Sequence, residues 1–159
     1  MIDRIVSRGG MVKNLHGQKN LYYQVNATYY SALGESDEKM LLARAIQMFM
    51  PGKPQIWYLD LFAGKNDHEA VQRAGESGHK EINRTNISVD QIAEGLKKDV
   101  VQKQLALIRM RNTHKAFSEG AEVTISGEES SLEIRWEYDG AYAELHVNFE
   151  EGTYTIESN

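Results

Sequence analysis

The C-terminal part of the sequence carries the pattern that most limits the fold: short segments in which apolar and polar residues alternate. Alternation with a period of two is typical of a strand with one buried face, and Asp-Gly favours a type I′ hairpin turn. We therefore predict a small antiparallel β domain at residues 118–159. The segments are 122–126, 132–138, 142–149 and 153–157, separated by Gly127, by Asp139-Gly140 and by Glu151-Gly152.

Ahead of this domain, a helix, a tight turn and an apolar segment follow one another. Residues 40–50 are apolar almost all round, with Ser36 as the predicted N-cap. Pro51 and Pro54 end this helix, because proline lacks an amide proton. Residues 55–62 are nearly all apolar or aromatic, which is typical of a strand covered on both faces in a parallel sheet. This order predicts one step of an α/β barrel.

The rest of the chain gives weaker patterns. Residues 1–6 predict an amphipathic helix, and residues 21–26 a short extended segment. Residues 63–86 are polar without a sustained period, so we predict a long loop there. Ser88 and Gln91 form a capping-box pattern that opens a helix, and a second helix is predicted for 99–113.

Length and composition narrow the function classes. The chain has 159 residues, whereas a complete (β/α)₈ barrel needs about 250. A net charge of −5 gives no general attraction to nucleic acid or to anionic membranes, and no apolar segment approaches the ~20 residues of a membrane span. Cysteine is absent, and the histidines show no zinc-site spacing. We therefore expect a cytoplasmic protein with no nucleic-acid or membrane partner, and no metal.

Several motifs resemble one enzyme family. Residues 51–67 are similar to the last barrel strand of the α-amylase superfamily. More narrowly, Ala63-Gly-Lys-Asn-Asp67, Glu81-Ile-Asn-Arg84 and residues 23–34 look like the sucrose phosphorylase branch of glycoside hydrolase family thirteen. The resemblance covers nearly the whole chain. It implies an α/β fold in which residues 1–117 are the C-terminal part of a (β/α)₈ barrel, followed by the antiparallel β domain at 118–159.

The resemblance also implies a reaction. Family members are retaining enzymes that transfer glucose from sucrose or sucrose 6′-phosphate to phosphate, giving glucose 1-phosphate and fructose or fructose 6-phosphate. Such enzymes need two carboxylates about 5 Å apart. The family places both before the position that corresponds to Met1, and Asp67-His68 reverses the family's histidine-aspartate motif. We therefore expect a C-terminal fragment that is inactive alone and needs no cofactor.

The resemblance implies that this segment supplies substrate-binding residues. Tyr23 and Gln24 correspond to an acceptor-lining loop. Before Ile82-Asn-Arg84, where typical members carry glycine-arginine-aspartate, this chain has Gly78-His-Lys-Glu81, which includes His79 and Lys80. Two potential cations there favour an anionic acceptor, such as sucrose 6′-phosphate or glucosylglycerate. A solvated pair without a ligand is the other interpretation of His79 and Lys80. Asp60 is expected to have a structural, hydrogen-bonded role.

Other functions stay open at this point. In the intact enzyme the partners would be a phosphorylated or neutral disaccharide and inorganic phosphate. A non-catalytic module that pairs with a separate N-terminal half, or that self-associates, is the alternative from another class, because an isolated barrel strand leaves its edges unpaired. A related α-glucosidase would differ only in passing glucose to water.

Overall fold

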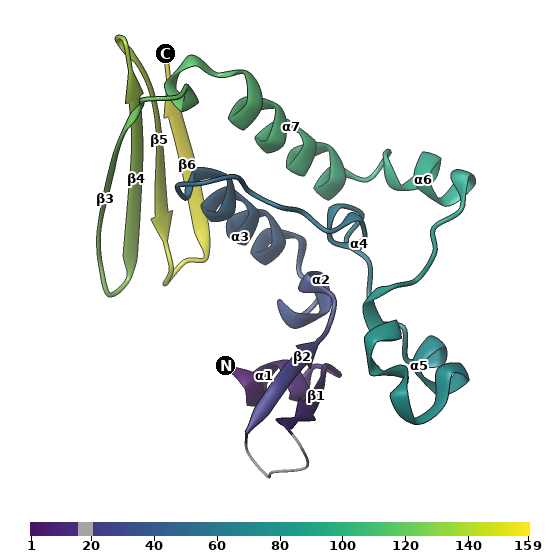
Figure 1. The fold of residues 1–159 in the computed structure, drawn as a ribbon. Helices are drawn as coiled ribbons and strands as arrows, with labels where there is room; N and C mark the ends of the chain where they lie inside the picture. Colours follow the sequence, from purple (N-terminus) through teal and green to yellow (C-terminus); the bar gives the residue numbers. More distant parts are fainter. Residues whose placement is uncertain (16–20) are drawn as a thin grey trace. The chain divides into compact units, whose positions relative to one another are not determined.

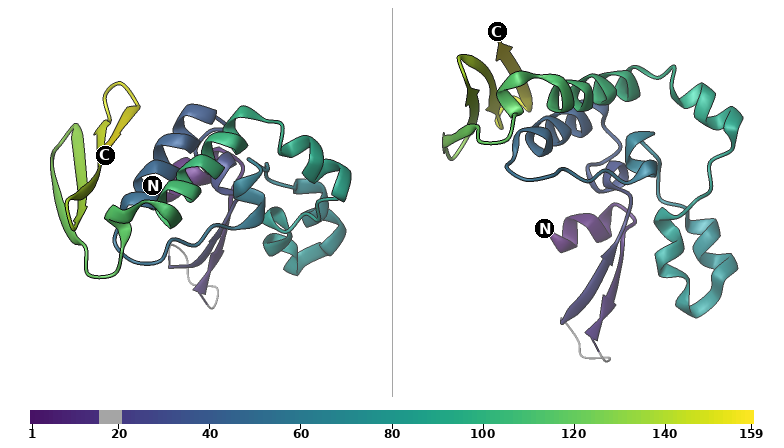
Figure 2. Two further views of the ribbon diagram at one scale, coloured as in Figure 1. Left: turned by 90° about the horizontal axis from the view of Figure 1, so that it is seen from above. Right: turned by 45° about the horizontal axis from the view of Figure 1, so that its top comes forward.

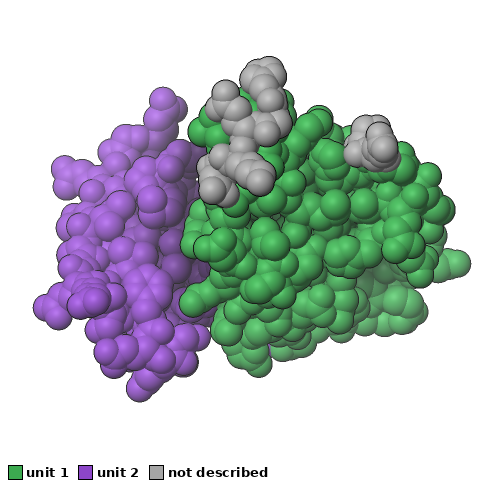
Figure 3. Space-filling model, turned by 90° about the horizontal axis from the view of Figure 1, so that it is seen from below, with its two compact units in different colours: residues 1–40, 56–101 green, residues 41–55, 102–159 purple. Residues whose placement is uncertain are grey.

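The structure, a computed structural model, describes residues 1–15 and 21–159 with all their side chains except those of Glu76 and Ser77. The chain forms two compact units (Figure 3). Unit 1 comprises residues 1–40 and 56–101, and unit 2 comprises residues 41–55 and 102–159. Unit 2 joins the C-terminal sheet to parts of two earlier helices, so the boundary near residue 118 stays a prediction from the sequence pattern.

Unit 2 contains the antiparallel meander that the alternating segments predict (Figure 1). Its strand order is β3-β4-β5-β6, and each strand pairs with the next along the chain. Asp139 and Gly140 connect β4 to β5 with φ values of 44° and 76°, as a type I′ turn requires. The strands are β3 (Glu122–Glu128), β4 (Ser131–Tyr138), β5 (Ala141–Asn148) and β6 (Thr153–Ser158).

One face of this sheet forms the core of unit 2 together with the unit 2 parts of helices α3 (Asp37–Phe49) and α7 (Asp99–Thr113), which lie on one side of the sheet in both views (Figure 2). Ile134, Ala143 and Leu145 point to this side and are fully buried. Both helices match the sequence-based expectations within a few residues.

Aromatic side chains connect the sheet to the end of α3. Phe117, in the short 3₁₀ helix η3 (Lys115–Phe117), lies between Phe49 and Trp136 with ring centroids 5.3 and 5.4 Å away. The Trp136 indole N–H donates to the Phe49 carbonyl oxygen at 2.6 Å. The Arg111 guanidinium lies over the Trp136 ring at 4.2 Å, and burial lowers the pKa of this group.

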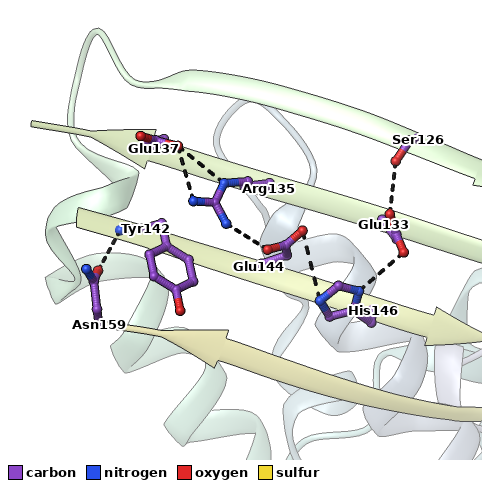
Figure 4. Close-up of polar contacts among 8 residues, drawn as sticks. All are labelled: Ser126, Glu133, Arg135, Glu137, Tyr142, Glu144, His146 and Asn159. Carbon is purple, nitrogen blue, oxygen red and sulfur yellow. Dashed lines mark hydrogen bonds and ion pairs between the residues drawn. The ribbon is translucent and has the colours of Figure 1, made fainter. Parts of the chain in front are cut away.

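The opposite face of the sheet is polar (Figure 4). Arg135 binds Glu144 at 2.8 Å and Glu137 at 3.2 Å, while its guanidinium lies 4.3 Å from the centre of the Tyr142 ring. His146 lies between Glu144 and the exposed Glu133. Side chains of this kind belong on a solvent-facing surface, so the sheet has one buried face, as the alternation predicts.

Unit 1 is built from short elements. Helix α1 confirms the expected N-terminal helix, and β2 confirms the extended segment; β1, its antiparallel partner, was not expected. Ser88 and Gln91 form the predicted capping box at the start of α6, with bonds of 3.2 and 2.8 Å. The elements are α1 (Ile2–Ser7), β1 (Met11–Asn14), β2 (Tyr22–Asn26), α2 (Tyr29–Ala32), α4 (Tyr58–Leu61), α5 (His68–Ala74), η2 (Gly75–Asn83) and α6 (Val89–Gly95).

The prediction of a buried strand at residues 55–62 is wrong for this structure. Residues 55–57 form no strand, and Tyr58–Leu61 forms the helical turn α4. Trp57 is 48% exposed and Tyr58 37%. A parallel strand is stabilised by hydrogen bonds to neighbours on both sides, and within the described residues no strand runs beside this segment. Without that ladder, local helical hydrogen bonds form instead.

The prediction of a structureless loop at 63–86 is also wrong. Helix α5 and the 3₁₀ helix η2 fill most of this segment, and Ile82 within it is fully buried. The Asp67 side chain caps α5 by accepting from the Ala70 amide at 2.8 Å. Within the described residues, no helix is long and apolar enough to span a lipid bilayer.

Candidate functional site

A small polar hollow in unit 1 brings together side chains from three separate segments. It has a volume of about 220 Å³, below the ~300 Å³ at which pockets for drug-sized ligands begin. Strand β2 supplies two side-chain amides, and Trp57, directly before α4, supplies an indole. Helix η2 and the residue after it supply a side-chain amide and two cations. The lining residues are Gln24, Asn26, Trp57, Lys80, Asn83 and Arg84.

Hydrogen bonds within unit 1 hold two of these segments together. The Trp57 indole N–H donates to the Asn83 carbonyl oxygen at 2.9 Å, and the Asn83 side chain donates to the Ala27 carbonyl oxygen at 3.2 Å. The Tyr58 hydroxyl donates to the Thr85 carbonyl oxygen at 2.8 Å. Backbone carbonyl oxygens after β2 and at and after the end of η2 therefore hold the wall of the hollow in place.

Two buried polar atoms at the hollow lack a hydrogen-bond partner among the described residues: Asn26 Nδ2, a donor, and Gln24 Oε1, an acceptor. Asn26 is only 4% exposed. Buried polar groups normally have a partner, because leaving one unsatisfied costs roughly 1–3 kcal/mol. A donor and an acceptor in the lining of one hollow suit a ligand that carries hydroxyl groups.

Charge at the hollow is positive. Lys80 and Arg84 are exposed, and the described lining includes no aspartate or glutamate. Glu81 lies 3.6 Å from the Arg84 guanidinium, an exposed ion pair that is weak in water. An anionic group could therefore bind two cations here: the compact ammonium of Lys80 and the planar guanidinium of Arg84.

The structure gathers only half of the residues expected to bind substrate. Gln24 and Lys80 line the hollow together. Tyr23 is 63% exposed, and neither Tyr23 nor His79 is among the described lining residues. His79 is half-buried, and its Nε2 has no partner within the described part of the chain.

Sequence reasoning missed four lining residues. Asn26, Asn83 and Arg84 belong to the motifs that carried the resemblance, so those motifs contained a signal for them. Trp57 lies in the segment predicted to be a buried strand, whereas its side chain is 48% exposed in the structure.

Asp60 has the structural role that we expected, although it lies in helix α4 and not in a strand. Its carboxylate accepts from the Tyr29 amide at 2.8 Å. Next to this contact, the Asn66 side chain accepts from the Thr28 amide at 2.7 Å. These two bonds tie the residues that follow β2 to α4 and to the segment after it, and they help to fix the position of β2, which carries Gln24 and Asn26.

A larger hollow of about 430 Å³ lies elsewhere in unit 1, between the end of α4 and helix α6. Leu59, Phe62 and Ile87 contribute apolar walls, with Lys65 and Lys98 also in its lining. We prefer the smaller hollow as the functional site, since unsatisfied buried polar atoms converge only there among the described residues. Those residues also include no cluster of three or more potential metal ligands.

Comparison with known proteins gives close relatives that are much longer. The chain is 52% identical over 159 residues to the sucrose 6(F)-phosphate phosphorylase of Ilumatobacter coccineus, covering 98% of this chain and 30% of the relative. It is 37% identical over 163 residues to the enzyme of the same name from Thermoanaerobacterium thermosaccharolyticum, covering 99% of this chain and 33% of that enzyme. Identity to the sucrose phosphorylase of Agrobacterium vitis is 42% over 134 residues, covering 84% of this chain and 27% of that enzyme.

The fold has a solved counterpart. The crystal structure of sucrose 6F-phosphate phosphorylase from Thermoanaerobacter thermosaccharolyticum matches with a TM-score of 0.91 and 39% identity, over 99% of this chain and 31% of that chain. No family model matches the sequence. The chain thus spans about 30% of the length of the relatives that it matches.

Proposed function

Because the chain is a homologue of part of the sucrose phosphorylases, we propose that it supplies the acceptor side of a retaining glucosyl-transferring site. The intact enzyme would convert sucrose or sucrose 6′-phosphate, with phosphate, into glucose 1-phosphate and fructose or fructose 6-phosphate. The chain alone would be inactive. The observation that carries this proposal is the hollow whose described lining combines amides, two cations and an indole but no carboxylate.

The lining suits binding rather than bond cleavage. Retaining transfer needs one carboxylate to attack the anomeric carbon and another, protonated, to release the leaving group. The hollow offers hydrogen bonds to hydroxyls through Gln24 and Asn26, and an aromatic surface through Trp57. In this proposal the remainder of the enzyme brings the two carboxylates and the other barrel strands, and unit 1 completes the barrel.

A phosphorylated acceptor fits the charges better than a neutral one. Lys80 and Arg84 both line the hollow, and either can bind a phosphate oxygen. Fructose 6-phosphate combines such a phosphate with the hydroxyls that Gln24 and Asn26 would bind. Glucosylglycerate-type substrates, with a carboxylate in place of the phosphate, are the alternative within the same class.

An activity assay tests the fragment proposal. The purified chain is supplied with sucrose, sucrose 6′-phosphate and phosphate, alone and with the remaining segment of the Ilumatobacter coccineus relative. We expect glucose 1-phosphate only when both segments are present. Turnover by the chain alone would refute the proposal, whereas release of free glucose by the mixture would identify a hydrolase that uses water.

Ligand binding to the chain alone tests the assignment of the hollow. The sequence has two tryptophans, of which Trp57 is 48% exposed in the hollow and Trp136 is 7% exposed in unit 2. We expect fructose 6-phosphate to change the Trp57 fluorescence at lower concentration than fructose does. Lys80→Ala should remove this preference, and Lys53→Ala, at an exposed lysine in the 51–54 turn, should keep it. Equal titrations with both sugars would exclude a phosphate site.

A second candidate is a non-catalytic module that pairs with a separate N-terminal half. Exposed aromatic side chains of unit 1 favour it, because soluble monomers rarely expose large apolar patches. Complex formation without phosphorolysis in the two-segment assay would support this candidate. These side chains, each more than a third exposed, are Tyr22, Tyr23, Tyr29, Trp57 and Tyr58.

A further inference from the structure

Strand β6 forms one edge of the four-stranded sheet, and within the described residues no strand lies on its outer side. Its residues, Thr153 to Ser158, are mostly β-branched or aromatic and include one charge, Glu157. Edge strands are usually protected from pairing by lysine, proline or a bulge. Strand β6 has no lysine and no proline, and its register with β5 is continuous. This edge is therefore chemically open to another strand.

The other edge, β3, is protected. It carries Glu122 and Glu128 at its two ends. If two copies of β3 paired antiparallel about Ile125, Glu122 of each copy would stand opposite Glu128 of the other. Like charges placed directly opposite destabilise a strand pair. The two edges thus differ in their tolerance of a second copy.

We propose that β6 is a homodimer interface, in which β6 of one copy pairs antiparallel with β6 of a second copy about Thr155. In this register Tyr154 stands opposite Ile156 of the second copy, and Thr153 opposite its Glu157. An aromatic residue opposite a β-branched one stabilises an antiparallel pair, and no like charges meet. The two sheets would form one continuous sheet.

The backbone of β6 permits this register. The Asn159 amide donates to the Tyr142 carbonyl oxygen at 3.4 Å, directly beyond the Ala143–Ser158 pair that ends the β5–β6 ladder, so the amide of Asn159 faces β5. Because hydrogen-bonded and non-bonded pairs alternate, the backbone groups of Tyr154 and Ile156 point away from β5. These are the two residues that pair across the proposed dimer axis.

The side chains agree with the backbone. Tyr154 and Ile156 lie on the apolar face of the sheet and are half-buried, so part of each remains for a second copy to cover. Thr155 lies on the polar face and is exposed. Five paired residues form a small interface, so the dimer population should rise with protein concentration.

A cysteine cross-link tests the register. The natural sequence has no cysteine, so Thr155→Cys introduces a single thiol per chain at the proposed axis. Under mild oxidation we expect a covalent dimer, because this register sets the two thiols directly opposite each other. Thr124→Cys is the matched control, since Thr124 is an exposed threonine on the polar face of the other edge strand. Equal cross-linking of both variants, or none for Thr155→Cys, would overturn the proposal.

A charge substitution tests the interface without cross-linking. Thr155→Lys places two ammonium groups opposite each other, and the exposed position tolerates lysine in the folded monomer, which circular dichroism checks. By light scattering we expect the wild type to approach the dimer mass at high concentration and Thr155→Lys to stay monomeric. Thr124→Lys should behave as the wild type. A wild type that is monomeric at every concentration, or a dimer that Thr155→Lys leaves intact, would contradict the proposal.

Discussion

Asp67 connects three segments of unit 1. Its Oδ1 accepts from the Ala70 amide at 2.8 Å, its Oδ2 accepts from the Thr85 hydroxyl at 2.7 Å, and its backbone amide donates to the Ile82 carbonyl oxygen at 2.9 Å. The hydrogen bond from Ala70, followed by that from Thr85, holds the pKa of this carboxyl below its usual value. The charged form of Asp67 therefore stabilises the fold.

This pKa shift predicts a pH dependence. A carboxyl with a lowered folded-state pKa stabilises the protein above its unfolded pKa of about 3.9, and the contribution disappears as the pH falls through the folded-state value. Asp67→Asn keeps an acceptor at the N-cap but removes the negative charge, so it should lower the free energy of unfolding by roughly 0.3–1 kcal/mol at pH 7. This difference should disappear at an acidic pH below the lowered folded-state pKa. Urea unfolding at both pH values measures it. A difference that stays constant between the two pH values would contradict this role of the Asp67 charge.

Trp136 gives a second prediction at the scale of single residues. Its indole N–H donates to the Phe49 carbonyl oxygen in a buried environment, and its ring lies against Phe117 and Arg111. Trp136→Phe keeps an aromatic ring but leaves that carbonyl without its donor, which costs roughly 1–3 kcal/mol. Chemical unfolding followed by circular dichroism should show this loss. Trp57→Phe, at a half-exposed position, should cost less, and an equal cost would contradict the assignment.

Single residues of the site were predictable only where a motif named them. Gln24 and Lys80 were expected, and they meet at the hollow because β2 and η2 converge there. Asn26 was not singled out although it lies in such a motif, since the motif does not show that Asn26 is 4% exposed or that its Nδ2 has no partner among the described residues. Contacts between segments distant in sequence decide which member of a motif faces a ligand.

At the scale of elements, local chemistry predicted the ends of helices and the turns of the sheet well. These features depend on hydrogen bonds or φ values within a few residues, so the local sequence is enough to predict them. They are the capping box of Ser88 and Gln91, the N-cap Ser36, and the turn at Asp139 and Gly140. The strand predicted at 55–62 depended on neighbouring strands, which are not local. The described chain supplies none, and α4 forms in its place.

The hairpin turn supports a prediction about the sheet. Gly140 has a φ of 76°, a left-handed conformation that costs an L-residue roughly 1–2 kcal/mol, and a Cβ there would meet no atom within 4 Å. Gly140→Ala should therefore destabilise the protein through backbone strain alone, which thermal unfolding measures. Asp139→Asn should change stability less, because asparagine also adopts left-handed φ values. A thermally neutral Gly140→Ala would show that the β4–β5 turn changes type.

For the whole molecule, the two units differ in how fully they cover their apolar residues. Unit 2 buries its sheet residues Ile134, Ala143 and Leu145 completely. Unit 1 exposes several aromatic side chains, among them Trp57 and Tyr58, in the segment whose sequence is typical of a strand covered on both faces. The sequence of that segment is thus adapted to surroundings that the described residues of unit 1 do not provide.

This difference predicts how the chain responds to the remaining segment of a homologous enzyme. If that segment covers unit 1, the exposed Trp57 becomes protected and the already buried Trp136 does not change. Acrylamide quenching of the Trp136→Phe variant, which reports on Trp57 alone, should therefore fall when the segment is added, and quenching of Trp57→Phe should stay the same. Unchanged quenching of Trp57 in a mixture that produces glucose 1-phosphate would mean that the catalytic partner binds elsewhere, and the barrel would then be completed without residues 55–57.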